Sequence, residues 1–155
     1  MTTHLYILVL FARFLWATSN VPSPVGGTCN CPMVPTDFIQ RACALNWISQ
    51  AQVVSSKTVG QSKTYTLKHL HVFKGDKSLP TQLLVENTGT DKSCTLSLAN
   101  KGTYLLGGLL SNGTQPQLTT SSCLSLAGLS PVWSKVPAAE KKQLNSLKCP
   151  SVPPK

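Results

Sequence analysis

The positions of the cysteines constrain this chain more than any other feature of its sequence. An even number of cysteines behind an apolar leader is typical of a disulfide framework formed in an oxidising compartment. The sequence alone leaves the pairing open, since six cysteines can be joined in many ways. If Cys29 and Cys31 each bond to a distant partner, the Cys29-Asn30-Cys31 tripeptide is fixed at both ends and becomes a rigid edge suited to another protein's cleft. The six lie at Cys29, Cys31, Cys43, Cys94, Cys123 and Cys149.

The beginning of the chain predicts a secretory signal peptide. Residues 5–11 form an apolar run that residues 14–16 extend, but Arg13 interrupts the run and the whole is too short to span a bilayer. We expect a signal peptide over 1–19, with cleavage that could extend to residue 28, followed by a Pro/Gly-rich linker over 20–28. A single domain over 29–149 and a tail over 150–155 complete the chain, which predicts a secreted, extracellular protein with no membrane span.

The net positive charge of the chain limits the kinds of molecule that it is expected to bind. The chain has 155 residues, with 14 Lys and Arg against 5 Asp and Glu, and a formal net charge of +9. The positive charge of a basic secreted domain favours binding to sulfated glycosaminoglycans, or it serves only to keep the domain soluble. The lysines are scattered rather than gathered in one run. Because no cluster interleaves basic with aromatic residues, we predict no nucleic-acid partner.

Two kinds of periodicity predict the elements. Helical spacing follows Pro35, with Thr36 or Asp37 as the N-cap of a short helix ending at Cys43. A second helix is predicted over 137–147, with Pro137 in its first turn. Between them lie five short segments rich in Val, Leu, Thr and Tyr and bounded by turn residues, which predict five strands over 47–55, 64–74, 81–86, 103–110 and 117–121.

Two details favour a closed barrel over an open sheet. Tyr65 and Leu67 share one face of the second strand while Leu70 and Val72 share the other, so the apolar phase slips once, as at a bulge. Two glycines, 107–108, fall inside the fourth strand, and bulges and glycines are the features that let a short sheet bend and close. The predicted fold is all-β with flanking helices: a five-stranded, closed Greek-key barrel of OB-like type, held by disulfides.

The ordered set of motifs resembles the inhibitory N-terminal domain of the tissue inhibitors of metalloproteinases, a branch of the netrin-like fold family. The resemblance runs from Cys29 to Cys149. No single motif is specific, but their shared order is. The motifs are the opening C-x-C, a third cysteine after a short helix, and the segments WISQAQVV (47–54), VFKG (72–75), TYLLGG (103–108), PVW (131–133) and EKKQL (140–144).

The resemblance implies a disulfide pattern and a mechanism. It pairs Cys29 with Cys94, Cys31 with Cys123, and Cys43 with Cys149. When the first cysteine is the mature N-terminus, the family's mechanism has the α-amino nitrogen and carbonyl oxygen of Cys29 chelate the catalytic zinc of a target protease. The chain would have no cofactor of its own, because that zinc belongs to the protease.

The same resemblance assigns the protease-binding residues. Asn30 would enter the primary specificity pocket, where the family usually has Thr or Ser. Pro32 would continue the edge, and Lys92 and Ser93, next to Cys94, would form a second strip of the same ridge. The expected partners are secreted or matrix zinc metalloproteinases, and the expected state is a monomer.

Other readings of the sequence remain open. A netrin-like interaction module that binds a receptor or a glycosaminoglycan, without inhibiting a protease, is the alternative function. Asn112-Gly113-Thr114 is both a hairpin-turn signal and an N-glycosylation sequon at Asn112.

The remaining chemistry-bearing residues point away from catalysis and metal binding. Cysteines at 29 and 31 with His69 and His71 match a structural zinc site, but oxidised cysteines are the expected state, with both histidines on a solvated strand face. Trp47 and Trp133 are expected to be packing residues, with no aromatic stacking platform. No catalytic spacing of acidic residues and histidines is present, so an enzyme is not predicted.

Overall fold

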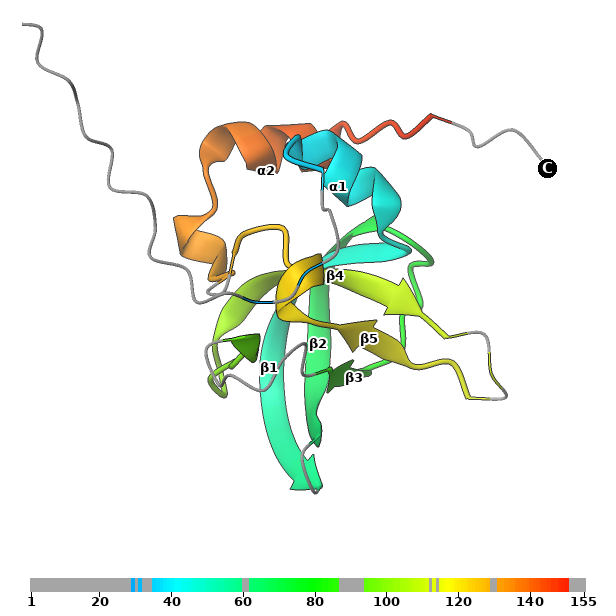
Figure 1. The fold of residues 1–155 in the computed structure, drawn as a ribbon, viewed down its shortest axis with the longest axis vertical. Coiled ribbons are helices and arrows are strands. Elements are labelled where there is room, and N and C mark those ends of the chain that lie inside the picture. The colour runs from blue at the N-terminus through cyan, green and yellow to red at the C-terminus, as the bar shows by residue number, and fades with distance from the viewer. Residues whose placement is uncertain are drawn as a thin grey trace, which may run out of the picture.

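The computed structural model describes residues 29, 31, 35–59, 62–86, 94–111, 113, 115–128 and 131–150. Its centre is a closed barrel with strand order β1-β2-β3-β5-β4, and helices α1 and α2 both lie over one end of it (Figure 1). Neighbouring strands are antiparallel except for β3 and β5, which are parallel. The predicted five-stranded OB-like barrel with flanking helices is therefore confirmed. The strands are β1 (Trp47–Val59), β2 (Ser62–Lys74), β3 (Gln82–Val85), β4 (Thr103–Leu110) and β5 (Leu118–Thr120).

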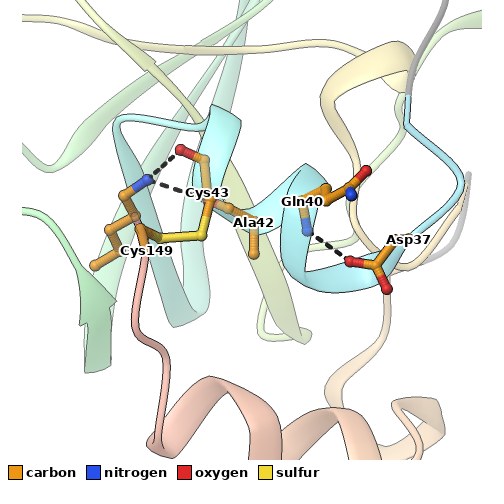
Figure 2. The surroundings of a disulfide bond; sticks show 6 residues. Asp37, Gln40, Ala42, Cys43 and Cys149 are labelled. Atoms are coloured by element: carbon orange, nitrogen blue, oxygen red, sulfur yellow. Dashed lines mark hydrogen bonds between the residues drawn. A yellow bond between two sulfur atoms is a disulfide. The ribbon is translucent and has the colours of Figure 1, made fainter. Parts of the chain in front are cut away.

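The helices are short and follow the predicted positions. Helix α1 spans Phe38–Ala44 and α2 spans Ala138–Asn145, with 3-10 turns η2 (Ser122–Leu124) and η3 (Trp133–Lys135) between β5 and α2. Asp37 is the N-cap of α1, because its carboxylate accepts a 2.8 Å hydrogen bond from the backbone N–H of Gln40 (Figure 2). Of the two predicted N-caps, Thr36 and Asp37, the structure uses the second.

Alternation along the strands builds two hydrophobic layers. On β4, Tyr104 and Leu106 point into the barrel core, while Leu105 between them packs under the helices. On β1 the same division places Trp47 inside and Ile48 beneath the helices. Both faces of these strands are therefore buried, one by the barrel interior and one by α1 and α2.

Bulges on the β1–β2 hairpin account for the predicted phase slip. The register passes from Gln50–His71 to Ala51–His69, so Leu70 is skipped, and its side chain is 46% exposed. Residues before the bulge, such as Tyr65 and Leu67, are buried in the core. Val72, beyond the bulge, again packs against that core.

The glycine pair on β4 allows close approach of neighbouring backbones. A Cβ added at Gly108 would overlap the carbonyl oxygen of Thr119, on the adjacent strand β5. A Cβ added at Gly107 would lie 2.7 Å from Cδ1 of Leu45. The two glycines therefore serve tight packing at the seam where β4 meets β5 and the helix layer.

Candidate functional site

Two disulfides join the Cys29–Cys31 segment to separate parts of the barrel. Cys29 is bonded to Cys94 with a Cα–Cα distance of 5.2 Å, and Cys31 to Cys123 with a Cα–Cα distance of 5.4 Å. Both distances lie in the ordinary range for disulfides. These are the pairs that the family resemblance implies. Together they fix the segment at two points that are separated by one residue.

The barrel topology brings Cys94 and Cys123, the disulfide partners of Cys29 and Cys31, to one end of the fold. Because β3 and β5 are parallel, the chain leaves both strands at the same edge, where the N–H of Glu86 donates a 2.8 Å hydrogen bond to the carbonyl of Thr120. Cys123 follows β5 directly, in η2, and Cys94 lies in the connection that follows β3. The Cys29–Cys31 segment is therefore attached at the edge where these parallel strands end.

Buried contacts hold the connection that carries Cys94. Leu96 and Leu98 insert into the barrel core, and Cys94 itself is only 1% exposed. The hydroxyl of Tyr65 accepts a 3.1 Å hydrogen bond from the backbone N–H of Leu98, and the hydroxyl of Tyr104 accepts one of 2.8 Å from Ala99. Cys29 is thus bonded to a segment that is packed and hydrogen-bonded into the core.

The local backbone at the edge is tightly turned. The N–H of Cys31 donates a 2.7 Å hydrogen bond to the carbonyl oxygen of Cys29, closing an i to i+2 turn. A carbonyl oxygen has two lone pairs, so that of Cys29 keeps one for another partner. Cys29 is half-buried and Cys31 is exposed.

The other residues assigned to the ridge are not placed. Asn30, Pro32, Lys92 and Ser93 lie outside the described residues, as do the predicted signal peptide, the linker and the glycosylation site Asn112. What the structure brings together is the pair of cysteines and their two anchors.

A third disulfide stabilises the helix layer, away from this edge. Cys43, in α1, is bonded to Cys149, which follows α2 (Figure 2). Lys74 at the end of β2 donates hydrogen bonds to the carbonyl oxygens of Cys43 and Ala42 at 2.6 and 3.3 Å. This role of Lys74 was not predicted, because its partners lie 31 and 32 residues away in the chain.

The prediction that both histidines lie on a solvated face is wrong for His69. Its Nε2 lies 3.0 Å from the carbonyl oxygen of Pro80, and its Nδ1 lies 2.9 Å from Oγ of the fully buried Ser49. His71 is exposed, as expected. The bulge at Leu70 accounts for this difference. In a regular strand His69 and His71 would lie on the same face, but the skipped residue between them breaks that alternation.

The described cysteines are all in disulfides. None of them is free, so Cys29 and Cys31 have no thiolate to offer a structural zinc.

The two tryptophans that were expected to be packing residues both pack in the fold. Trp47 is fully buried in the barrel core. Trp133 also packs against the helix layer, but its ring stacks on Phe73 with centroids 5.8 Å apart, a stacking contact that was not predicted.

Comparisons with known proteins do not identify a family for this chain. No protein-family model matches the chain, and a search of curated proteins gives no significant match. Within the described ranges, no helix has the length and apolar character needed to cross a membrane. Three disulfides fit a protein that matures in an oxidising, extracellular environment.

Proposed function

We propose that this chain is a secreted inhibitor of zinc metalloendopeptidases. In the proposed mechanism the α-amino nitrogen and the carbonyl oxygen of Cys29 chelate the catalytic zinc of the protease. They take the coordination position that the attacking water needs, so the protease loses its nucleophile. The observation that carries the proposal is the attachment of Cys29 and Cys31 by two disulfides to one edge of the barrel.

Rigidity is the physical reason that this attachment supports an inhibitor. A flexible N-terminus would lose conformational entropy on entering a protease cleft, and that loss would weaken binding. Here the anchor of Cys29 is Cys94, whose segment is packed into the barrel core. The ligand atoms are therefore held in place before the protease arrives.

Zinc binding also requires that Cys29 be the first residue of the mature chain. An α-amine has an ordinary pKa of about 8, so near neutral pH zinc competes effectively with its proton. In a longer chain the same nitrogen is a peptide amide and a very poor metal ligand. The proposal therefore includes proteolytic removal of residues 1–28, either by signal peptidase or by a second cleavage in the Pro/Gly-rich linker.

The decisive experiment compares two N-termini on the same fold. Protein beginning at Cys29 and protein with one additional Ala before Cys29 are prepared with all three disulfides formed. Both are assayed against a panel of zinc endopeptidases. We expect the first to inhibit at micromolar concentration or below and the second to be inactive, with indistinguishable circular dichroism spectra. Failure of the first protein against the whole panel would contradict the proposal.

The basic charge of the domain supports a second candidate function: the chain's net charge of +9 falls by one, to +8, when the predicted signal peptide with Arg13 is removed. A netrin-like module with this charge would bind a sulfated glycosaminoglycan or an acidic receptor surface without engaging a protease. The mature N-terminus discriminates between the two functions, because only the inhibitor needs a free amine at Cys29. Sequencing the N-terminus of the secreted protein therefore tests both.

A further inference from the structure

One edge of strand β1 lacks a neighbouring strand in its second half. Strand β4 pairs with β1 only over 47–52, and the last bonds from that side join Val53 to Lys101 and Gly102. Over 54–59, β1 pairs with β2 alone, and no other described segment forms a backbone hydrogen bond to its open side. This half of β1 extends away from the end of the barrel that the helices cover (Figure 1).

The backbone groups of Ser56 and Thr58 point toward this open side. The N–H and the carbonyl of Val53 both bond on the β4 side, and alternate residues of a strand present their backbone groups to the same edge. Val54 is the extra residue of a bulge in the β1–β2 pairing. The alternation therefore resumes one residue later, at Ser56 and Thr58. Each of these two residues offers one donor and one acceptor to a further strand.

The open edge belongs to a sheet that is held by the barrel core. In this part of the fold the strands lie in the order β1, β2, β3 and β5, and Ser56 lies opposite Tyr65 of β2. Tyr65 is fully buried, as is Leu83, its partner on β3. A strand added beside β1 would extend a sheet that is already formed, so the protein would lose little conformational entropy on binding.

The side chains along the edge are exposed, and the lysines beside it lie on both faces. Residues 54–58 are all exposed, with Val54 at 55%. Lys57 lies on one face of the strand. Lys63 of β2 lies on the other face, with its ammonium 5.0 Å from the centre of the Tyr65 ring. A strand placed here would therefore meet positive charge above and below its backbone.

The balance of charge favours an acidic partner. Residues 47–75 include no Asp or Glu, and Lys101 adds a positive charge where the bonds to Val53 are made. Glu86, which follows β3, lies on the far side of β2 from the open edge. A second copy of this chain would bring two Lys57 side chains close together, and like charges on adjacent strands are unfavourable. Carboxylates on an incoming strand would instead be attracted.

We propose that the open edge of β1 over residues 54–58 binds an extended acidic peptide segment, which adds to the sheet beside β1. The backbone of the segment pairs with Ser56 and Thr58, and its carboxylates lie near Lys57 and Lys63. The inference is independent of the proposed inhibition, because none of these residues belongs to the Cys29–Cys31 edge.

Amide exchange in the disulfide-bonded protein tests the inference. The probe is a capped hexapeptide of alternating Glu and Val, and the matched peptide of alternating Lys and Val is the charge control. We expect the acidic peptide to slow the solvent exchange of the Ser56 and Thr58 amide protons and to leave that of Lys57, which faces β2, unchanged. The basic peptide should bind at least about tenfold more weakly.

Substitutions on the edge separate backbone pairing from charge. Ser56→Pro removes a backbone donor and places a ring on the open edge, where an edge strand tolerates proline. We expect it to lower the affinity for the acidic peptide by at least about tenfold. Ser56→Ala keeps the donor and should bind like the original protein. Lys57→Met should weaken binding, whereas Lys142→Met, at an exposed position on α2, should not.

Several results would overturn the inference. Slow exchange of Ser56 and Thr58 without peptide would mean that the edge is already covered, by a second copy if it depends on protein concentration and by this chain itself if it does not. Equal affinities of Ser56→Pro and Ser56→Ala would exclude strand addition. Equal binding of the two peptides would remove the role of charge, and a heparin tetrasaccharide that protects the same two amide protons would show a plain anion site.

Discussion

The ammonium group of Lys74 donates a 2.6 Å hydrogen bond to the carbonyl oxygen of Cys43, in the last turn of α1. A second hydrogen bond of 3.3 Å reaches the carbonyl of Ala42. Carbonyls at the C-terminal end of a helix lack partners within the helix and carry partial negative charge, so a cation there is favourable. Lys74 therefore connects the end of β2 to the helix that the Cys43–Cys149 disulfide also holds.

Replacing Lys74 with Met should destabilise the fold. The substitution leaves two carbonyls without their donor and removes a cation from the helix C-terminus, so we expect a loss of about 1–2 kcal/mol in the free energy of unfolding. Lys68→Met, at an exposed position on the same strand, is the matched control and should change stability by less than about 0.5 kcal/mol. Urea denaturation of both variants measures the difference, and equal effects would contradict the capping role.

Lys74 should also give stability a pH dependence in the alkaline range. Burial lowers the pKa of Lys74 below its ordinary value of 10.5. Between the lowered folded pKa and the unfolded value, the unfolded chain binds more protons, so the free energy of unfolding rises with pH. We expect this rise just below pH 10.5 in the original protein, and a shallower slope in Lys74→Met. Identical slopes would show that Lys74 titrates alike in both states.

The glycine at the β4–β5 seam should not tolerate a side chain. Gly108→Ala would force a methyl group onto the carbonyl of Thr119, so β4 and β5 would have to separate. We expect a loss of about 3 kcal/mol or more, at the upper end of single-substitution effects. Gly113→Ala is the control, since its nearest neighbour would lie 3.8 Å away. Thermal unfolding of the two variants decides whether the space at Gly108 is needed.

His69 should matter to stability where His71 does not. A carbonyl oxygen only accepts, so Nε2 of His69 carries the proton that bonds Pro80, and Nδ1 accepts from the hydroxyl of Ser49. His69→Leu would leave both groups unpaired, one of them fully buried, at a cost of about 1–3 kcal/mol. His71→Leu changes an exposed residue on the same strand and should have a small effect. Similar losses in the two variants would contradict this assignment.

The contrast between these residues shows which contacts a sequence of this kind can predict. The composition of 103–110 and the turn residues that bound it predicted β4 with its observed bounds, and Tyr104 and Leu106 on this strand face the core in period-2 order. The predicted first strand was too short, because the hairpin pairing continues to Val59–Ser62 through polar residues that carry no apolar signal. Composition and turn residues thus located the strands, while their polar extensions were missed.

Long-range polar contacts were beyond the reach of the sequence for a different reason. The bonds from Lys74 to α1 depend on where the end of β2 meets a helix 31 residues earlier in the chain. The environment of His69 depends on which residue the bulge skips, and a skip at Leu70 rather than a neighbour changes the face of every residue that follows. At the candidate site, the close spacing of Cys29 and Cys31 could be recognised in the sequence, whereas their disulfide partners, 65 and 92 residues away, could not be assigned from spacing alone.

The second candidate function predicts a measurable salt dependence. If scattered surface lysines bind a sulfated glycosaminoglycan, their attraction is long-range and is screened by salt. We expect retention on a heparin column at physiological ionic strength and elution as salt rises further. Elution below physiological ionic strength would leave the basic composition as a solubility feature and would remove the support for this function.

The disulfides should differ in what they contribute to inhibition. Cys31→Ser with Cys123→Ser frees one end of the proposed zinc-binding edge, whereas Cys43→Ser with Cys149→Ser frees the helix layer. Each bridge closes a long loop, so chain-entropy arguments give each a stabilisation of roughly 4–5 kcal/mol. In protein trimmed to Cys29, we expect the first pair to weaken inhibition by at least about tenfold even in the folded fraction, because the edge must then be ordered on binding.

The Cys43–Cys149 variant is the matched control for that prediction. It should melt at a lower temperature, yet inhibit as well as the unmodified protein wherever it is folded, since Cys29 and Cys31 keep both of their anchors. Inhibition constants measured well below each melting temperature separate rigidity from stability. Equal weakening in both variants would mean that the disulfides act on inhibition only through the fold, and that the attachment of Cys31 has no separate role at the protease.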